Sequence, residues 1–165
     1  MKRQILTAAA AVLATGAAFA QTDLFEAEDM DETGGWTVSA AVDKAAGSKT
    51  ITAEKKGDDA EQVFVTGACN RYAWVRAANL FATNEAPSKF VLQFAGVDTT
   101  VEVKGPKGKF VWTKAATALM PAGYGAFSLK SLDGTKVAID CVLVTDSKSF
   151  VPPDDAEGLA KLRKK

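Results

Sequence analysis

From residue 24 to residue 145 the chain alternates apolar and polar residues with a period of two. This alternation is interrupted every few residues by Gly, Asp, Asn, Lys or Pro. Phe90, Leu92 and Phe94, for example, fall on one face of an extended segment, and the residues between them fall on the other. Such a period is typical of half-buried antiparallel strands. Many short strands at close spacing, with no long helical period, predict an all-β fold built as an antiparallel β-sandwich.

The alternation divides this region into ten expected strands, separated by turn sequences such as Asp133-Gly134. The expected strands are Leu24–Glu28, Trp36–Ala41, Thr50–Ala53, Gln62–Val65, Arg71–Ala77, Lys89–Phe94, Thr99–Val103, Phe110–Lys114, Ala126–Leu129 and Lys136–Val144. The stretch Thr113–Met120 also allows one helical turn, which Pro121 would end. After the strands, Asp154 can begin a short helix whose acidic start and basic end match the helix dipole.

The first 20 residues have the pattern of a secretory signal peptide. Lys2 and Arg3 form a basic start, residues 5–14 are apolar without charge, and Ala18-Phe19-Ala20 matches a small-x-small cleavage site. The apolar run is too short to span a membrane convincingly. We therefore expect a signal peptide over residues 1–20, a sandwich domain over 21–150 and a proline-led charged tail over 151–165. The mature chain would begin at Gln21 and be secreted or periplasmic, without a membrane span.

Composition excludes several classes of function. Removing Lys2 and Arg3 with the signal leaves 18 basic and 20 acidic residues, a formal charge of −2. This balance gives no electrostatic reason to expect a nucleic acid partner. Histidine is absent from all 165 residues, which removes the commonest general base and the commonest transition-metal ligand. No motif suggests another catalytic arrangement, so we expect no enzyme activity.

The two cysteines, Cys69 and Cys141, have two possible states. Outside the cytoplasm they can form a disulfide, which in the chain-entropy model would stabilise the fold by roughly 4 kcal/mol. Alternatively they are two buried free thiols that pack as small apolar side chains. The sequence does not show whether their Cα atoms come within bonding reach.

Three segments resemble carbohydrate-binding modules of families 6 and 35, which belong to the galactose-binding-like superfamily. They are Phe25–Glu28, Tyr72–Ala77 and Ile139–Val144. The chain is also similar to uncharacterised secreted domains of that superfamily. The segments that match their pattern are Glu26–Asp29, Gly34–Trp36, Asp140–Thr145 and Phe150–Pro153. The resemblance implies a jelly-roll β-sandwich with a structural calcium ion at one edge.

Position by position, the resemblance implies that Glu26, Glu28 and Asp140 provide the side-chain ligands of that calcium ion. The residues themselves are compatible with this role. Glu26 and Glu28 are two apart, so on a strand both project from one face and repel each other unless a cation or a proton intervenes. Asp140 lies in an otherwise apolar strand, where a lone charge is costly. The alternative for the two glutamates is a solvated, unpaired strand face.

In the related modules, sugars bind in a cleft between loops and stack on one or two aromatic rings. The resemblance and the loop positions make Trp112, Tyr124 and Trp36 the candidate ligand-binding residues. The alternative is that these rings fill the core, as large rings usually do. Trp74 shares a strand face with Tyr72 and Arg76, and we expect it to pack in the core or against a neighbouring strand.

Together these features predict a secreted, non-catalytic binding module, stabilised by calcium, that recognises a glycan or another cell-surface polymer. The alternative is a structural or protein-interaction component of the envelope that keeps the sandwich without a sugar site. Such a protein would dock its partner through an exposed sheet edge or through the C-terminal tail.

Overall fold

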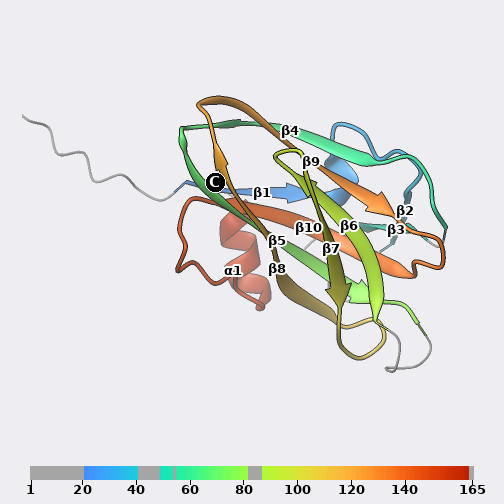
Figure 1. The fold of residues 1–165 in the computed structure, drawn as a ribbon. Helices are drawn as coiled ribbons and strands as arrows, with labels where there is room; N and C mark the ends of the chain where they lie inside the picture. Colours follow the sequence, from blue (N-terminus) through green and yellow to red (C-terminus); the bar gives the residue numbers. More distant parts are fainter. Residues whose placement is uncertain (1–20, 41–48, 54, 82–86, 164–165) are drawn as a thin grey trace, which may run out of the picture.

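The computed structural model describes residues 21–40, 49–53, 55–81 and 87–163 and folds them into two antiparallel sheets packed face to face (Figure 1). The predicted signal peptide lies outside the described residues. The fold is the expected antiparallel jelly-roll β-sandwich with a short C-terminal helical tail. Among the described residues, no helix has the length and apolar character needed to cross a membrane.

The two sheets contain ten strands. The larger sheet has the order β2 (Thr37–Ala40), β3 (Lys49–Ala53), β10 (Val137–Thr145), β5 (Cys69–Asn79) and β8 (Phe110–Met120), and β1 (Thr22–Glu26) also pairs with β10. The smaller sheet has the order β4 (Ala60–Thr66), β9 (Gly123–Ser131), β6 (Ser88–Phe94) and β7 (Val97–Val103). Each expected strand is therefore present.

Two local expectations are wrong. The stretch Thr113–Met120 contains no helical turn, because it continues β8, which pairs with β5 as far as Met120 opposite Cys69. Glu28 is not on the first strand, because β1 ends at Glu26 and the chain turns into the 3-10 helix η1 (Ala27–Asp29). The two glutamates therefore lie on different elements.

Strand β10 organises the larger sheet. It pairs with β5 on one side, and on the other side it pairs with β1 and β3 in succession. The pairing with β1 ends at Glu26 opposite Cys141, and the pairing with β3 begins at Ile51 opposite Ile139. Between them, Asp140 forms a β-bulge against β5. A bulge changes the direction of a side chain locally, and this one lies where β1 ends and β3 begins.

The core lies between the sheets and is rich in aromatic rings. Phe90, Leu92 and Phe94 of β6 are at most 1% exposed, as their shared face predicts. Phe25 of β1 contacts the rings of Phe64 and Phe127, with centroid distances of 5.6 and 5.5 Å. Burial of such side chains is the main stabilising contribution to a domain of this size.

The C-terminal segment turns back after β10 and ends in α1 (Ala156–Arg163), which lies beside the larger sheet and contacts β1 (Figure 1). The Asp155 carboxylate caps the helix by accepting a hydrogen bond from the Gly158 backbone N–H at 2.8 Å. Leu159 is 1% exposed. The indole N–H of Trp112 donates to the Pro153 carbonyl at 3.0 Å. These contacts fix the described part of the tail on the domain.

Of the two states that the sequence allows, the disulfide is not formed, and both cysteines are free thiols. Cys69 is the first residue of β5. Cys141 lies on β10 and pairs with Arg76 of β5, which is seven residues further along β5 than Cys69. Seven residues of extended strand span roughly 23 Å, far beyond disulfide reach.

A reducing agent should therefore leave the melting temperature of the folded protein unchanged. The same chain unfolded without reductant should react with a thiol reagent at both cysteines. A lower melting temperature in reductant, or a single reactive thiol, would show that a disulfide forms after all.

Candidate functional site

Three carboxylates come together where β1, η1 and the β10 bulge meet. They belong to Glu26, Glu28 and Asp140, and the charges of Glu26 and Asp140 both act on Glu28. Two arginines that no sequence pattern marks accompany them. Arg76 lies on β5, and Arg163 lies in the last turn of α1.

Arg76 and Asp140 form a buried ion pair. The Arg76 guanidinium donates from Nη1 to Asp140 Oδ2 at 2.8 Å, and the two side chains are 8% and 0% exposed. The Cys141 thiol also donates to Asp140 Oδ2, at 3.6 Å. Burial, with the Asp140 charge beside it, holds the pKa of the Cys141 thiol well above 9.0. Asp140 therefore has a partner inside its apolar strand, as the cost of a lone charge at that position leads one to expect.

Glu26 is bound on both carboxylate oxygens by a single guanidinium. Arg163 donates from Nε to Glu26 Oε1 and from Nη2 to Glu26 Oε2, the second at 3.0 Å. The two side chains are 27% and 18% exposed. Burial opposes the charge of Arg163, but the hydrogen bonds and charge of Glu26 raise its pKa above the usual value.

Glu28 occupies the least favourable position for a charge in this cluster. Its Oε2 atom is buried and has no hydrogen-bond partner within the described structure. Burial raises the pKa of Glu28, and the charges of Glu26, Asp29 and Asp140 raise it further.

The three carboxylates do not form a calcium shell in this arrangement. Guanidinium groups bind both oxygens of Glu26 and one oxygen of Asp140. Within the described ranges, no group of three or more acidic, cysteine or histidine side chains is placed to hold a metal ion. A calcium ion requires six to eight oxygens and would compete with Arg163 for Glu26. We therefore derive no role for calcium from this geometry.

The three candidate aromatic residues lie in three different environments. Trp36 is 5% exposed and donates its indole N–H to the Leu129 carbonyl at 3.0 Å, so it belongs to the core and offers no face to a ligand. Trp112 is half-buried beside the C-terminal segment. Eight residues of β8, roughly 26 Å of extended strand, separate Trp112 from Met120, close to the start of β9 and Tyr124. These residues do not converge on one site.

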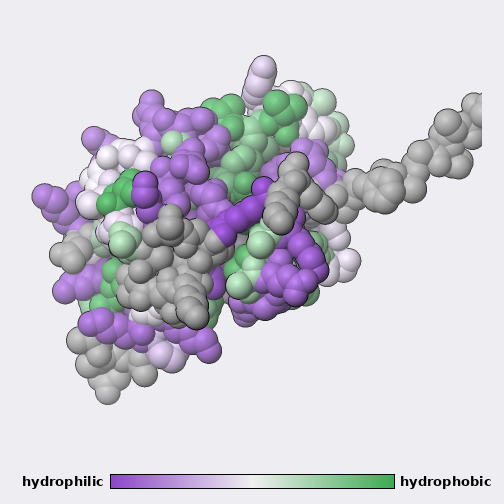
Figure 2. Space-filling view, turned by 180° about the vertical axis from the view of Figure 1, so that it is seen from behind, coloured by the Kyte–Doolittle hydropathy of each residue, from purple (hydrophilic) through white to green (hydrophobic). Residues whose placement is uncertain are grey.

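Tyr124 stands free on the outer face of the smaller sheet. Its side chain is 82% exposed, and it pairs across the sheet with Val65, which is 67% exposed. Val63 lies on the same face two residues earlier and is 50% exposed. Gly125 leaves room for the Phe64 ring beneath it, because a Cβ at residue 125 would lie 2.8 Å from that ring. The side of the molecule opposite to that in Figure 1 is drawn in Figure 2, where hydrophobic surface lies at the upper middle of the view and hydrophilic side chains lie at its left.

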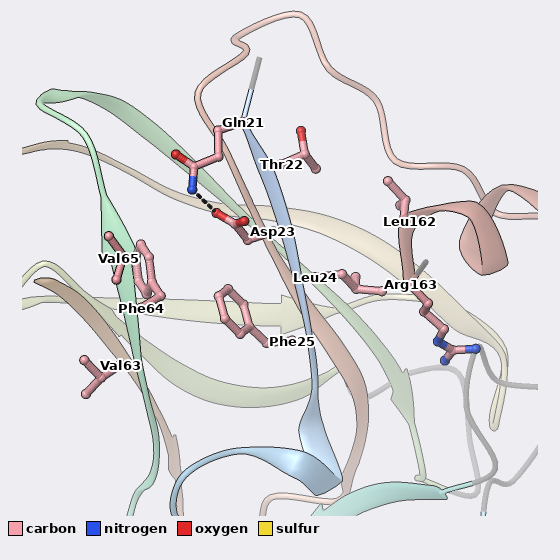
Figure 3. A pocket seen from close by; sticks show the side chains of 10 residues that line it. All are labelled: Gln21, Thr22, Asp23, Leu24, Phe25, Val63, Phe64, Val65, Leu162 and Arg163. Atoms are coloured by element: carbon pink, nitrogen blue, oxygen red, sulfur yellow. Dashed lines mark hydrogen bonds between the residues drawn. The ribbon is translucent and has the colours of Figure 1, made fainter. Parts of the chain in front are cut away.

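A groove runs along β1, between the edge strand β4 and the last turn of α1 (Figure 3). Its volume is about 530 Å³. Val63, Phe64 and Val65 line it from β4, and Leu162 and Arg163 line it from α1. Val63 and Val65 line this groove and also lie on the sheet face that carries Tyr124. The groove and the exposed Tyr124 ring therefore both adjoin strand β4.

The start of β1 gives the groove a polar end. The Gln21 side chain donates to Asp23 Oδ2 at 2.9 Å (Figure 3). It also accepts a hydrogen bond from Arg71. Arg71 is 1% exposed and donates from Nε to Thr66 at 2.8 Å. Burial raises the pKa of Asp23, and the charge of Arg71 partly offsets this. Amide and carboxylate groups of this kind can bond the hydroxyl groups of a ligand.

A second aromatic group lies on the outer face of the larger sheet. Lys114 of β8 lies over the rings of Tyr72 and Trp74, with Nζ 4.5 and 5.9 Å from their centroids. Cross-strand packing was expected for Trp74 from its alternation with Tyr72. The lysine over the rings could not be anticipated, because it depends on the bulge that sets the register of β8 against β5.

No family model matches the chain, and no curated protein matches it in sequence. Solved structures share its fold. A β-1,4-mannanase from Podospora anserina that carries a family 35 module matches with a TM-score of 0.63 and 20% identity, over 81% of this chain and 29% of that one. The C-terminal family 6 module of LamC, a marine laminarinase from Zobellia galactanivorans, matches with a TM-score of 0.59 and 17% identity, over 76% of this chain and 99% of that one.

A family 35 module from Clostridium thermocellum matches with a TM-score of 0.56 and 14% identity, over 74% of this chain and 97% of that one. The fold is therefore that of the β-sandwich seen in carbohydrate-binding modules of families 6 and 35. The chain spans nearly the full length of the two isolated modules but less than a third of the mannanase.

Proposed function

We propose that this protein is an exported, non-catalytic module that binds a glycan through Tyr124 and the adjoining groove. The observation that carries the proposal is the exposed ring of Tyr124, on a sandwich whose fold is that of carbohydrate-binding modules. A flat aromatic ring stacks on the apolar face of a pyranose, and the nearby groove offers amide and carboxylate groups to its hydroxyls. The signal-peptide pattern of residues 1–20 supports export, to the periplasm or beyond the cell.

The chemistry of the remaining residues supports binding without catalysis. The chain has no histidine. Two of the three gathered carboxylates are held by arginines, Glu26 by Arg163 and Asp140 by Arg76. A pair of carboxylates that hydrolyses a glycosidic bond must flank that bond on either side. Groups already bound to guanidinium are not available for that task.

Replacing Tyr124 by alanine should abolish most glycan binding without weakening the fold. Loss of an exposed aromatic anchor typically costs about 1–2 kcal/mol of binding energy, roughly a 5–30-fold loss of affinity. Tyr124→Phe should retain most of the affinity, because the ring is kept. Isothermal titration calorimetry with β-1,4-mannan, β-1,3-galactan and a broader panel of plant, algal and bacterial polysaccharides measures both variants.

Leu119→Ala is the matched control, because Leu119 is 76% exposed on the strand that precedes the turn to Tyr124. It removes exposed apolar surface from the other sheet and should leave affinity unchanged. Equal loss of binding in both variants would place the site elsewhere. Folded protein that binds no polysaccharide in the panel would refute the proposal and favour a protein-docking role for the sandwich.

A further inference from the structure

The carboxylate cluster at the end of β1 contains its own cations. Carboxylates that come this close repel one another unless positive charge lies between or beside them. Arg76 pairs with Asp140 from within the sheet, and Arg163 reaches Glu26 from the C-terminal helix. Glu26 and Arg163 are 137 residues apart in the sequence.

We propose that Arg163 of α1 supplies the positive charge beside Glu26, so that an ion pair within the chain, rather than a bound divalent metal, holds the end of β1. The helix is then a structural clamp that joins the last described turn of the chain to its first strand.

The helix is anchored before it reaches the cluster. Leu159 is buried, and the Trp112 indole holds the Pro153 carbonyl just upstream of the helix. Because the helix is fixed at these points, little additional backbone freedom is lost when Arg163 binds Glu26, and the remaining entropic cost is the rotamer freedom of the two side chains.

The geometry of the pair also favours stability. The guanidinium meets the carboxylate with two parallel N–H···O hydrogen bonds, an arrangement stronger and more specific than a single contact. The side chains of Arg163 and Glu26 are 27% and 18% exposed, so salt screens the pair less than it screens a fully exposed one. Nearby Asp140 adds further negative charge that favours Arg163.

Thermal unfolding of the exported protein tests the clamp. Arg163→Gln should lower the melting temperature by about 3–5 °C. Lys161→Gln is the matched control on the same helix, since Lys161 pairs with Glu157 one turn earlier, and both side chains are largely exposed. This control should shift the melting temperature by less than about 1 °C. Adding a chelator to the wild type should also leave the temperature unchanged.

The double variant Glu26→Gln with Arg163→Gln separates the ion pair from other roles of the helix. If the two residues stabilise the fold through each other, its shift should be no larger than the larger single shift. Three results would each overturn the proposal: a melting temperature several degrees lower in chelator, equal shifts for the Arg163 and Lys161 variants, or fully additive shifts in the double variant.

Discussion

Asp140→Asn should lower the free energy of unfolding by about 3–5 kcal/mol, a large part of the 5–15 kcal/mol typical of a domain. The substitution keeps the size of the side chain but removes its charge. Arg76 would then remain in the sheet, 7% exposed, without its partner carboxylate. The cost arises from the buried charge that is left behind, and it exceeds the net contribution of the intact pair.

Urea unfolding followed by circular dichroism measures this loss. Glu102→Gln is the control, because it removes a carboxylate whose ion pair with Lys89 has exposed side chains. That variant should lose no more than about 0.5 kcal/mol. A loss below about 1 kcal/mol for Asp140→Asn would mean that water or another group compensates Arg76, contrary to its burial.

Trp36→Ala should lower the free energy of unfolding by about 3–5 kcal/mol, while leaving glycan affinity unchanged in whatever protein remains folded. The ring is buried between the sheets, so its removal leaves a cavity that the surrounding side chains fill only partly. This is the opposite of the result expected for Tyr124→Ala, which should reduce binding and leave stability intact.

Trp36→Phe is a milder substitution than Trp36→Ala, and the variant should still fold. It removes the indole donor, so the Leu129 carbonyl loses its hydrogen bond from the ring, at a cost of about 1–3 kcal/mol. Val38→Ala, on the neighbouring strand and 43% exposed, should cost less than about 0.5 kcal/mol. Reduced glycan affinity in a folded Trp36→Phe protein would show that the residue contributes to the binding site after all.

The fold could be predicted because its signal is local. In β6 and β7, alternate residues are buried or exposed according to their position in the sequence, as Phe90, Leu92, Val101 and Val103 show. The ends of the strands were predicted less accurately. β8 runs six residues beyond its expected end at Lys114. Pairing with β5 stabilises this alanine-rich stretch, which has little preference of its own for an extended strand.

The site could be predicted only in part. The resemblance implied that Glu26, Glu28 and Asp140 act together, but nothing in the sequence marked the arginines that accompany them. Arg163 is separated from Glu26 by almost the whole chain, and no local pattern marks it. The distance between Cys69 and Cys141 could not be predicted for a similar reason, since it depends on which residue of β5 lies opposite Cys141.

The sequence by itself determined the class of fold and the face of each strand that enters the core, because a period of two is fixed by the pleat of the strand. It also indicated that Asp140 has a partner, because an unpaired charge among buried apolar side chains is costly. Only the tertiary structure decided that Arg76 and Arg163 meet those carboxylates, that Trp36 is buried and that Tyr124 stands free. These outcomes depend on how two sheets and a helix pack together, and such contacts join residues whose positions in the sequence carry no information about each other.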